Sequence, residues 1–111
     1  MKEISISESS SYWADIYVSG DTTLIRHFCQ EYVLRGLCVS IFDARYVYTG
    51  GTETGCLVRL INYARFPSDP ATITSTALDL AKLLIEKLHQ GSASVITPDK
   101  SYFLSRRDND A

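Results

Sequence analysis

The sequence contains few of the residues that usually carry catalysis, metals or cross-links. In 111 residues there are three cysteines, two histidines, one tryptophan and one methionine. The cysteines are odd in number, lack a Cys-x-x-Cys spacing and lie among apolar neighbours, as small core residues do in a reducing compartment. A metal site built from His27 and Cys29 is disfavoured, because residues i and i+2 of a helix point in different directions. We therefore expect no disulfide framework, no metal and no other cofactor.

The sequence also lacks an excess of one charge and any long hydrophobic run. Eleven Lys and Arg against thirteen Asp and Glu leave a net charge of -2, which gives no general attraction to nucleic acid or anionic membranes. No stretch approaches the roughly 18 apolar residues of a membrane-spanning helix. The polar, alternating start at residues 1–7 does not resemble a secretion signal. These absences predict a cytoplasmic protein with neither membrane nor nucleic acid as a partner.

The residues that are present are those of a folded domain. Hydrophobic residues make up 45% of the chain and charged residues 22%, which is typical of globular proteins and unlike disordered ones. The length is that of one domain and is too short for two independent cores. We expect a single domain over residues 1–111, with residues 1–11 and 106–111 frayed.

Two segments have helical periodicity. After a possible N-cap at Asp21, apolar pairs recur at intervals of four residues until Gly36, which predicts a helix over Thr22 to Leu34. A second apolar stripe begins after Ser68 or Asp69, either of which can cap a helix with proline in its first turn. This stripe predicts a helix over residues 70–89.

The remaining segments have the composition of strands. Alternation, β-branched residues or short apolar runs mark them. The predicted strands are Tyr12 to Val18, Leu37 to Phe42, Cys56 to Tyr63, Ala93 to Ile96 and Ser101 to Leu104. Arg45 to Thr49 resumes the extended backbone after residues 43–44, which predicts a long, bent hairpin with Cys56 to Tyr63. The glycine-rich segment Gly50 to Gly55 joins two of these strands and lacks a following helix and Lys-Ser/Thr pair, so it is interpreted as a hairpin turn and not as a phosphate loop.

The order β-α-β-β-α-β followed by a short strand predicts an α+β fold. We expect a two-layer, ferredoxin-like sandwich in which both helices lie on one face of an antiparallel sheet. The strands at residues 37–42 and 56–63 are apolar on both sides, and two helices can cover only one of these sides. The uncovered side predicts a homo-oligomer, at least a dimer.

One charged residue lies inside an apolar strand. Arg59 shares a strand face with Leu57 and Ile61. One interpretation is a salt bridge to Glu53 or Asp15 within the fold. The other is an arginine and tyrosine pocket for a phosphate or carboxylate group, which arginine binds in a bidentate manner. The residues predicted to contact this ligand are Arg59, Asn62, Tyr63, Arg65, Arg106, Tyr48 and Tyr102, with Arg107 and Tyr46 beside them.

No arrangement typical of catalysis is recognisable. His27 and His89 fit structural positions on the predicted helices, and neither neighbours a nucleophile motif. Asp43, Glu53 and Asp99 lie in or near predicted turns, where acidic residues are common without a function. These observations favour a non-catalytic binding protein over a small enzyme.

Three segments resemble small uncharacterised bacteriophage proteins. They are Tyr46 to Gly55, Leu60 to Pro67 and Thr97 to Asp99, and the resemblance extends over most of the chain from about Tyr12. It implies a phage protein acting in the host cytoplasm, where such non-enzymatic proteins sequester a host signal or block a host complex. No functional residue comes with this resemblance.

Two functions therefore compete. In the first, the homo-oligomer captures a small anionic, nucleotide-like ligand in its arginine and tyrosine pocket. In the second, a tyrosine-rich surface blocks a host protein complex, as an inhibitor of host defence would, because tyrosine suits protein recognition. We expect the first.

Overall fold

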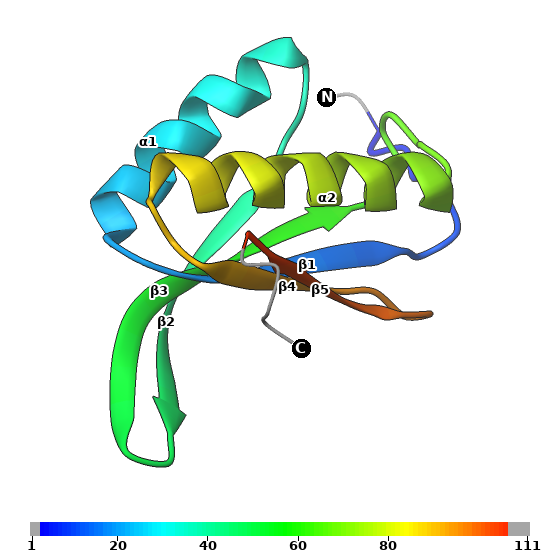
Figure 1. Cartoon of the computed structure of the whole chain (residues 1–111). Helices are drawn as coiled ribbons and strands as arrows, with labels where there is room; N and C mark the ends of the chain where they lie inside the picture. Colours follow the sequence, from blue (N-terminus) through cyan, green and yellow to red (C-terminus); the bar gives the residue numbers. More distant parts are fainter. Residues whose placement is uncertain (1–2, 107–111) are drawn as a thin grey trace.

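The computed structural model describes residues 3–106 of the chain (Figure 1). Over these residues it contains two α-helices, one short 3-10 helix and five strands. In chain order they are β1 (Trp13–Ser19), α1 (Thr22–Tyr32), η1 (Val33–Arg35), β2 (Ser40–Tyr48), β3 (Gly51–Ile61), α2 (Pro70–Lys87), β4 (Ser92–Ile96) and β5 (Ser101–Ser105). Arg107, which was predicted to lie beside the ligand pocket, falls outside the described residues.

The five strands form one antiparallel sheet in the order β2-β3-β1-β4-β5. Both helices lie on the same face of this sheet (Figure 1). The predicted two-layer α+β architecture is confirmed. The first four strands are compatible with a ferredoxin-like arrangement, and β5 adds a strand at the β4 edge.

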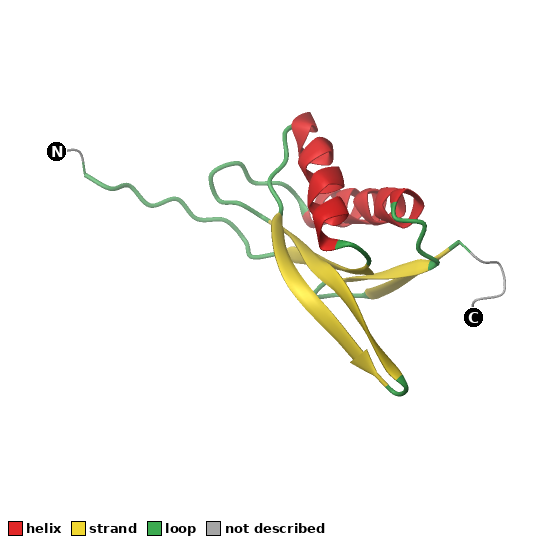
Figure 2. Cartoon of the chain, turned by 90° about the vertical axis from the view of Figure 1, so that its left-hand side faces the viewer, coloured by secondary structure: helices red, strands yellow, loops and turns green. Residues whose placement is uncertain are grey.

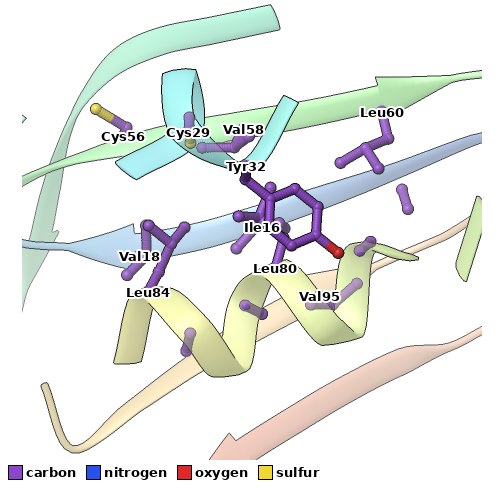
Figure 3. Close-up of a cluster of buried hydrophobic side chains, with 14 of the residues drawn as sticks. Ile16, Val18, Cys29, Tyr32, Cys56, Val58, Leu60, Leu80, Leu84 and Val95 are labelled. Carbon is purple, nitrogen blue, oxygen red and sulfur yellow. The ribbon is translucent and has the colours of Figure 1, made fainter. Parts of the chain in front are cut away.

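The core lies between the helices and the sheet. Every second residue of the two central strands points into it, as the two-residue period of a strand requires. From β1 these are Ala14, Ile16 and Val18, and from β3 they are Cys56, Val58 and Leu60. The apolar stripe of α2 packs against them with Leu80 and Leu84 (Figure 3).

Local capping groups set the helix ends. The Asp21 carboxylate accepts hydrogen bonds from the backbone N–H groups of Thr23 and Leu24, and the Asp69 carboxylate accepts one from Thr72. The predicted N-cap at Asp21 is confirmed, and of the two candidates for α2, Ser68 and Asp69, the cap is Asp69. Gly36 follows η1 with a φ of 98°, a left-handed conformation that glycine adopts without strain.

The predicted long hairpin is present, but its turn is shorter than expected. Residues 40–48 form one continuous strand, and the turn occupies only residues 49 and 50. Gly51 to Gly55 were predicted as part of the turn, but they belong to β3. β-branched Thr52 and Thr54 favour extended backbone there. The result is a long hairpin that projects from the sheet away from the helices (Figure 2).

The position of β2 in the sheet also differs. Residues 37–42 are apolar on both sides, a pattern typical of a central strand, yet β2 forms one edge of the sheet and its Phe42 is exposed. Leu37 and Val39 precede the strand and pack against the core from the helix side, as does Ile41. The apolar run at residues 37–42 therefore contributes side chains to the helix-covered face of the sheet and to the segment that leads into β2.

Within residues 3–106, neither helix combines the length and apolar character needed to cross a membrane.

Candidate functional site

The sheet face opposite the helices carries an unusual mixture of aromatic, apolar and charged side chains. Its residues alternate with those of the core along each strand. We call this surface the open face. It includes Trp13, Asp15, Tyr17, Phe42, Leu57, Arg59, Ile61, Ile96 and Phe103.

An ion pair lies at the centre of the open face. Asp15 and Arg59 are direct partners in the β1–β3 register, and the guanidinium donates two hydrogen bonds of 2.7 Å from Nε and Nη2 to the two carboxylate oxygens. Asp15 is 2% exposed, whereas the Arg59 side chain is 42% exposed. Hydrogen bonding to Asp15 raises the pKa of Arg59. Of the partners considered from the sequence, Asp15 is the one that Arg59 contacts.

A second polar group lies where the hairpin leaves the sheet. We call it the tyrosine–glutamate cluster, and it comprises Tyr17, Ser19, Tyr46, Tyr48 and Glu53. The rings of Tyr17 and Tyr46 meet edge to face with centroids 6.5 Å apart. Glu53 is the register partner of Tyr46, and its carboxylate accepts a 3.1 Å hydrogen bond from the Tyr48 hydroxyl.

The ionisation of this cluster is set by its hydrogen bonds. Bonds from Ser19 and Tyr48 lower the pKa of Glu53, so its carboxylate is charged at neutral pH. Burial raises the pKa of Tyr46 to about 12, and its hydroxyl donates a 2.6 Å bond to the carbonyl of Cys56. A fixed carboxylate among neutral aromatic rings is suited to bind an organic cation.

Sequence reasoning singled out Tyr46 and Tyr48 as candidate ligand contacts but did not identify the cluster as a whole. It placed Glu53 in a turn and did not single out Tyr17. The signal that was present is the alternation of Thr52, Glu53 and Thr54, in which β-branched residues flank the glutamate as in a strand.

The residues predicted to contact a ligand lie in several places. Asn62 is held in the connection after β3, where its side chain donates to the carbonyl of Ser10 and accepts from the N–H of Ser68. Arg65 is exposed in the same connection. Tyr48 lies in the hairpin, Tyr102 packs against the core from β5, and Arg106 follows β5. The structure does not bring these side chains together, and their binding role remains a prediction.

Tyr63 lines a cavity that is separate from Arg59 and the tyrosine–glutamate cluster. A cavity of about 260 Å³ lies between the residues before β2, the end of β3 and the start of α2. Tyr63 and Phe66 line it with rings 5.3 Å apart, and the Tyr63 hydroxyl contacts Cys38 Sγ at 3.2 Å. Arg59 is not among its lining residues.

The three cysteines differ in their burial. Cys29 and Cys56 are buried, as expected of core residues, and burial raises the pKa of Cys29 to about 11. Cys38 is exposed, contrary to its expected place in the core, because it precedes the edge strand β2. Over residues 3–106, no three side chains of His, Cys, Asp or Glu gather closely enough to hold a metal.

Two solved structures share this fold. One is a phage SAM (S-adenosylmethionine) lyase in the apo state, with a TM-score of 0.68, 20% identity and coverage of 86% of this chain and 90% of the lyase. The other is a phage SAM lyase in complex with S-methyl-5'-thioadenosine, with a TM-score of 0.68, 18% identity and coverage of 98% and 100%. No family model and no curated protein sequence matches the chain. At this identity the likeness establishes the fold.

The likeness corrects the predicted function. A non-catalytic protein that captures an anionic ligand is contradicted, since both structural neighbours are enzymes. The alternative, an inhibitor of a host complex, gains no support. The resemblance to phage proteins agrees with the source of both neighbours, although it did not include their activity.

Proposed function

We propose that this protein is a lyase that cleaves SAM and releases S-methyl-5'-thioadenosine. The observation that carries this proposal is the match to a SAM lyase bound to that nucleoside, which spans 98% of this chain and all of the lyase. A match of this extent leaves no large insertion or missing layer between the two folds. The tyrosine–glutamate cluster supports the proposal with chemistry suited to a cationic substrate.

The proposed reaction breaks one carbon–sulfur bond. S-methyl-5'-thioadenosine is SAM without its 3-amino-3-carboxypropyl group, so the bond between the sulfonium and Cγ of that group is cleaved. The electron pair of this bond passes to sulfur, which becomes a neutral thioether. A carboxylate oxygen of the departing group forms the new bond to Cγ, giving a lactone. Atoms and charge balance without water or proton transfer, so the protein has to bind and orient the substrate.

The tyrosine–glutamate cluster can provide this binding. The Glu53 carboxylate attracts the positive charges of the substrate, and the rings of Tyr17, Tyr46 and Tyr48 offer surfaces for a cation and for the flat adenine. Arg59 lies six residues from Glu53 along the same strand, a distance of about 20 Å. It is therefore outside contact distance of a cation held at Glu53.

We expect purified protein to convert SAM to S-methyl-5'-thioadenosine, measured by liquid chromatography. Glu53→Gln should lower kcat/KM at least about tenfold, because the amide keeps the shape and removes the charge that attracts the substrate. Glu31→Gln, on the exposed surface of α1, is the matched control and should leave the rate unchanged. Equal rates for both variants would remove Glu53 from the site, and absence of the thioadenosine product would overturn the lyase itself.

Labelled water separates a lyase from a hydrolase. In H₂¹⁸O, direct hydrolysis at Cγ places ¹⁸O in the γ-hydroxyl of the four-carbon product. A lactone that opens later by attack at its carbonyl carries the label in the carboxyl group instead. Fragment masses distinguish these positions, and a labelled γ-hydroxyl would contradict the lyase chemistry.

We further propose a phage origin with action in the host cytoplasm, supported by the source of both structural neighbours.

We also propose a homo-oligomer that covers the apolar part of the open face, where Phe42, Ile61 and Phe103 are exposed. These three side chains lie on β2, β3 and β5, and packing against a second copy would remove their apolar surface from water. Light scattering at micromolar concentration should give a mass of at least two chains, and the mass of one chain would contradict self-association.

A further inference from the structure

The N-terminal arm, residues 3–11, is extended and belongs to no helix or strand (Figure 2). Ile4 is 93% exposed and Ile6 is 91% exposed. They alternate with Ser5 and Ser7, so in extended backbone both isoleucines point to one side and both serines to the other. This segment has the pattern of a half-buried strand without a sheet to join.

Hydrogen bonds to Asn62, just after β3, fix the direction in which the arm leaves β1. The N–H of Asn62 donates a 2.9 Å hydrogen bond to the carbonyl of Tyr12, and the Asn62 side-chain amide donates a 2.7 Å bond to the carbonyl of Ser10. A third bond, from the N–H of Ser68 to Asn62 Oδ1, holds the amide in this orientation. The arm therefore continues the line of β1 outward, and turning back onto its own β2 would break these bonds.

The free edge of β2 offers the complementary surface. β2 is the last strand on its side of the sheet, so backbone groups along that edge face outward without a partner strand. Between this edge and α1 lies a groove of about 350 Å³ whose apolar lining includes Cys29, Val33, Leu37, Val39 and Ile41. A strand added to β2 would point every second side chain toward this groove.

We propose that the N-terminal arm of one copy pairs with β2 of a second copy and places Ile4 and Ile6 in the groove beneath α1. The arm has extended backbone before the bond at Ser10, and β2 offers a free edge over Ser40–Tyr48. The arm carries Glu3 and Glu8 and no cation between residues 3 and 11, and the charged residue that lines the groove is Arg26, which also pairs with Asp43. Exchange of an identical segment between copies is a common route to a homo-oligomer. This inference does not depend on the proposed lyase activity.

Disulfide trapping on the full chain tests the pairing. A chain with Val39→Cys in the groove and Cys38→Ser, to remove the neighbouring thiol, receives one further cysteine at position 4, 5, 6 or 7. Oxidised glutathione is the oxidant. We expect cross-linked pairs of chains from Ile4→Cys or Ile6→Cys at a yield several-fold above that from Ser5→Cys or Ser7→Cys, because only the first two point toward the groove.

Several results would overturn the proposal. They are equal yields from the four positions, a disulfide within one chain, and the absence of any cross-link. A second measurement uses no cysteine: in sedimentation equilibrium, Ile4→Ser with Ile6→Ser should weaken self-association by at least about tenfold through loss of apolar burial. Ser5→Ala with Ser7→Ala is the matched control and should leave the association constant unchanged. Equal constants for the two double variants also contradict the proposal.

Discussion

Replacing Arg59 by methionine is expected to lower the free energy of unfolding by about 3 kcal/mol. The substitution keeps an unbranched side chain over the sheet but removes both hydrogen bonds to Asp15. Asp15 is 2% exposed, so its carboxyl group cannot recover these bonds from water and is left buried without a partner. Urea unfolding at neutral pH measures the change.

A double-mutant cycle assigns this loss to the ion pair. Asp15→Leu alone leaves the half-exposed guanidinium unpaired, whereas Asp15→Leu with Arg59→Met replaces the pair by apolar side chains. The double variant should be more stable than Arg59→Met alone, because its only unpaired buried charge has been removed. Arg65→Met, at an exposed position, should change stability by less than about 0.5 kcal/mol. An unchanged stability of Arg59→Met would show that Asp15 does not depend on this partner.

Gly55→Ala is expected to destabilise the protein by about 3 kcal/mol or more. A Cβ at this position would lie 2.2 Å from the carbonyl oxygen of Val18 and 2.8 Å from Cα of Ser19, both backbone atoms of β1. It would also lie 2.8 Å from Cε2 of Tyr46. Relief of these contacts requires β1 and β3 to separate, and they are the central pair of the sheet.

Gly51→Ala provides the matched control in the same strand. Its Cβ would meet only the Tyr48 side chain, at 3.2 Å, and that exposed ring can move. We expect a cost below about 1 kcal/mol, measured by urea unfolding under the same conditions. Equal losses from the two variants would show that the approach of β1 to Gly55 is unimportant for stability.

Much of the helical layer could be predicted from the sequence because its determinants are local. Asp21 and Asp69 bond to N–H groups two or three residues away, and the apolar stripe of α2 repeats within a single helix. Each of these interactions joins residues that are neighbours in the chain. Only the last turns differ, since α1 passes into η1 before Gly36 and α2 ends at Lys87.

The candidate site could be predicted only in part. Arg59 was noticed because a charge inside an apolar strand needs a partner, yet its choice of Asp15 depends on the β1–β3 register across 44 positions of sequence. Glu53 was placed in a turn because glycines surround it. In the structure Gly55 allows the backbone of β1 to approach closely, because a side chain there would clash with it. Glu53 lies in a strand opposite Tyr46.

The sequence by itself determined the order of helices and strands, the helix caps, the two-layer class and the presence of a sheet face that no helix covers. These properties follow from local bonding and from side-chain periodicity within one element. Only the tertiary structure decided that β2 lies at the edge, that Asp15 pairs with Arg59, and that Tyr17, Tyr46 and Glu53 meet. Strand order and register join residues far apart in the chain, and their choice depends on which pairing buries the most apolar surface overall.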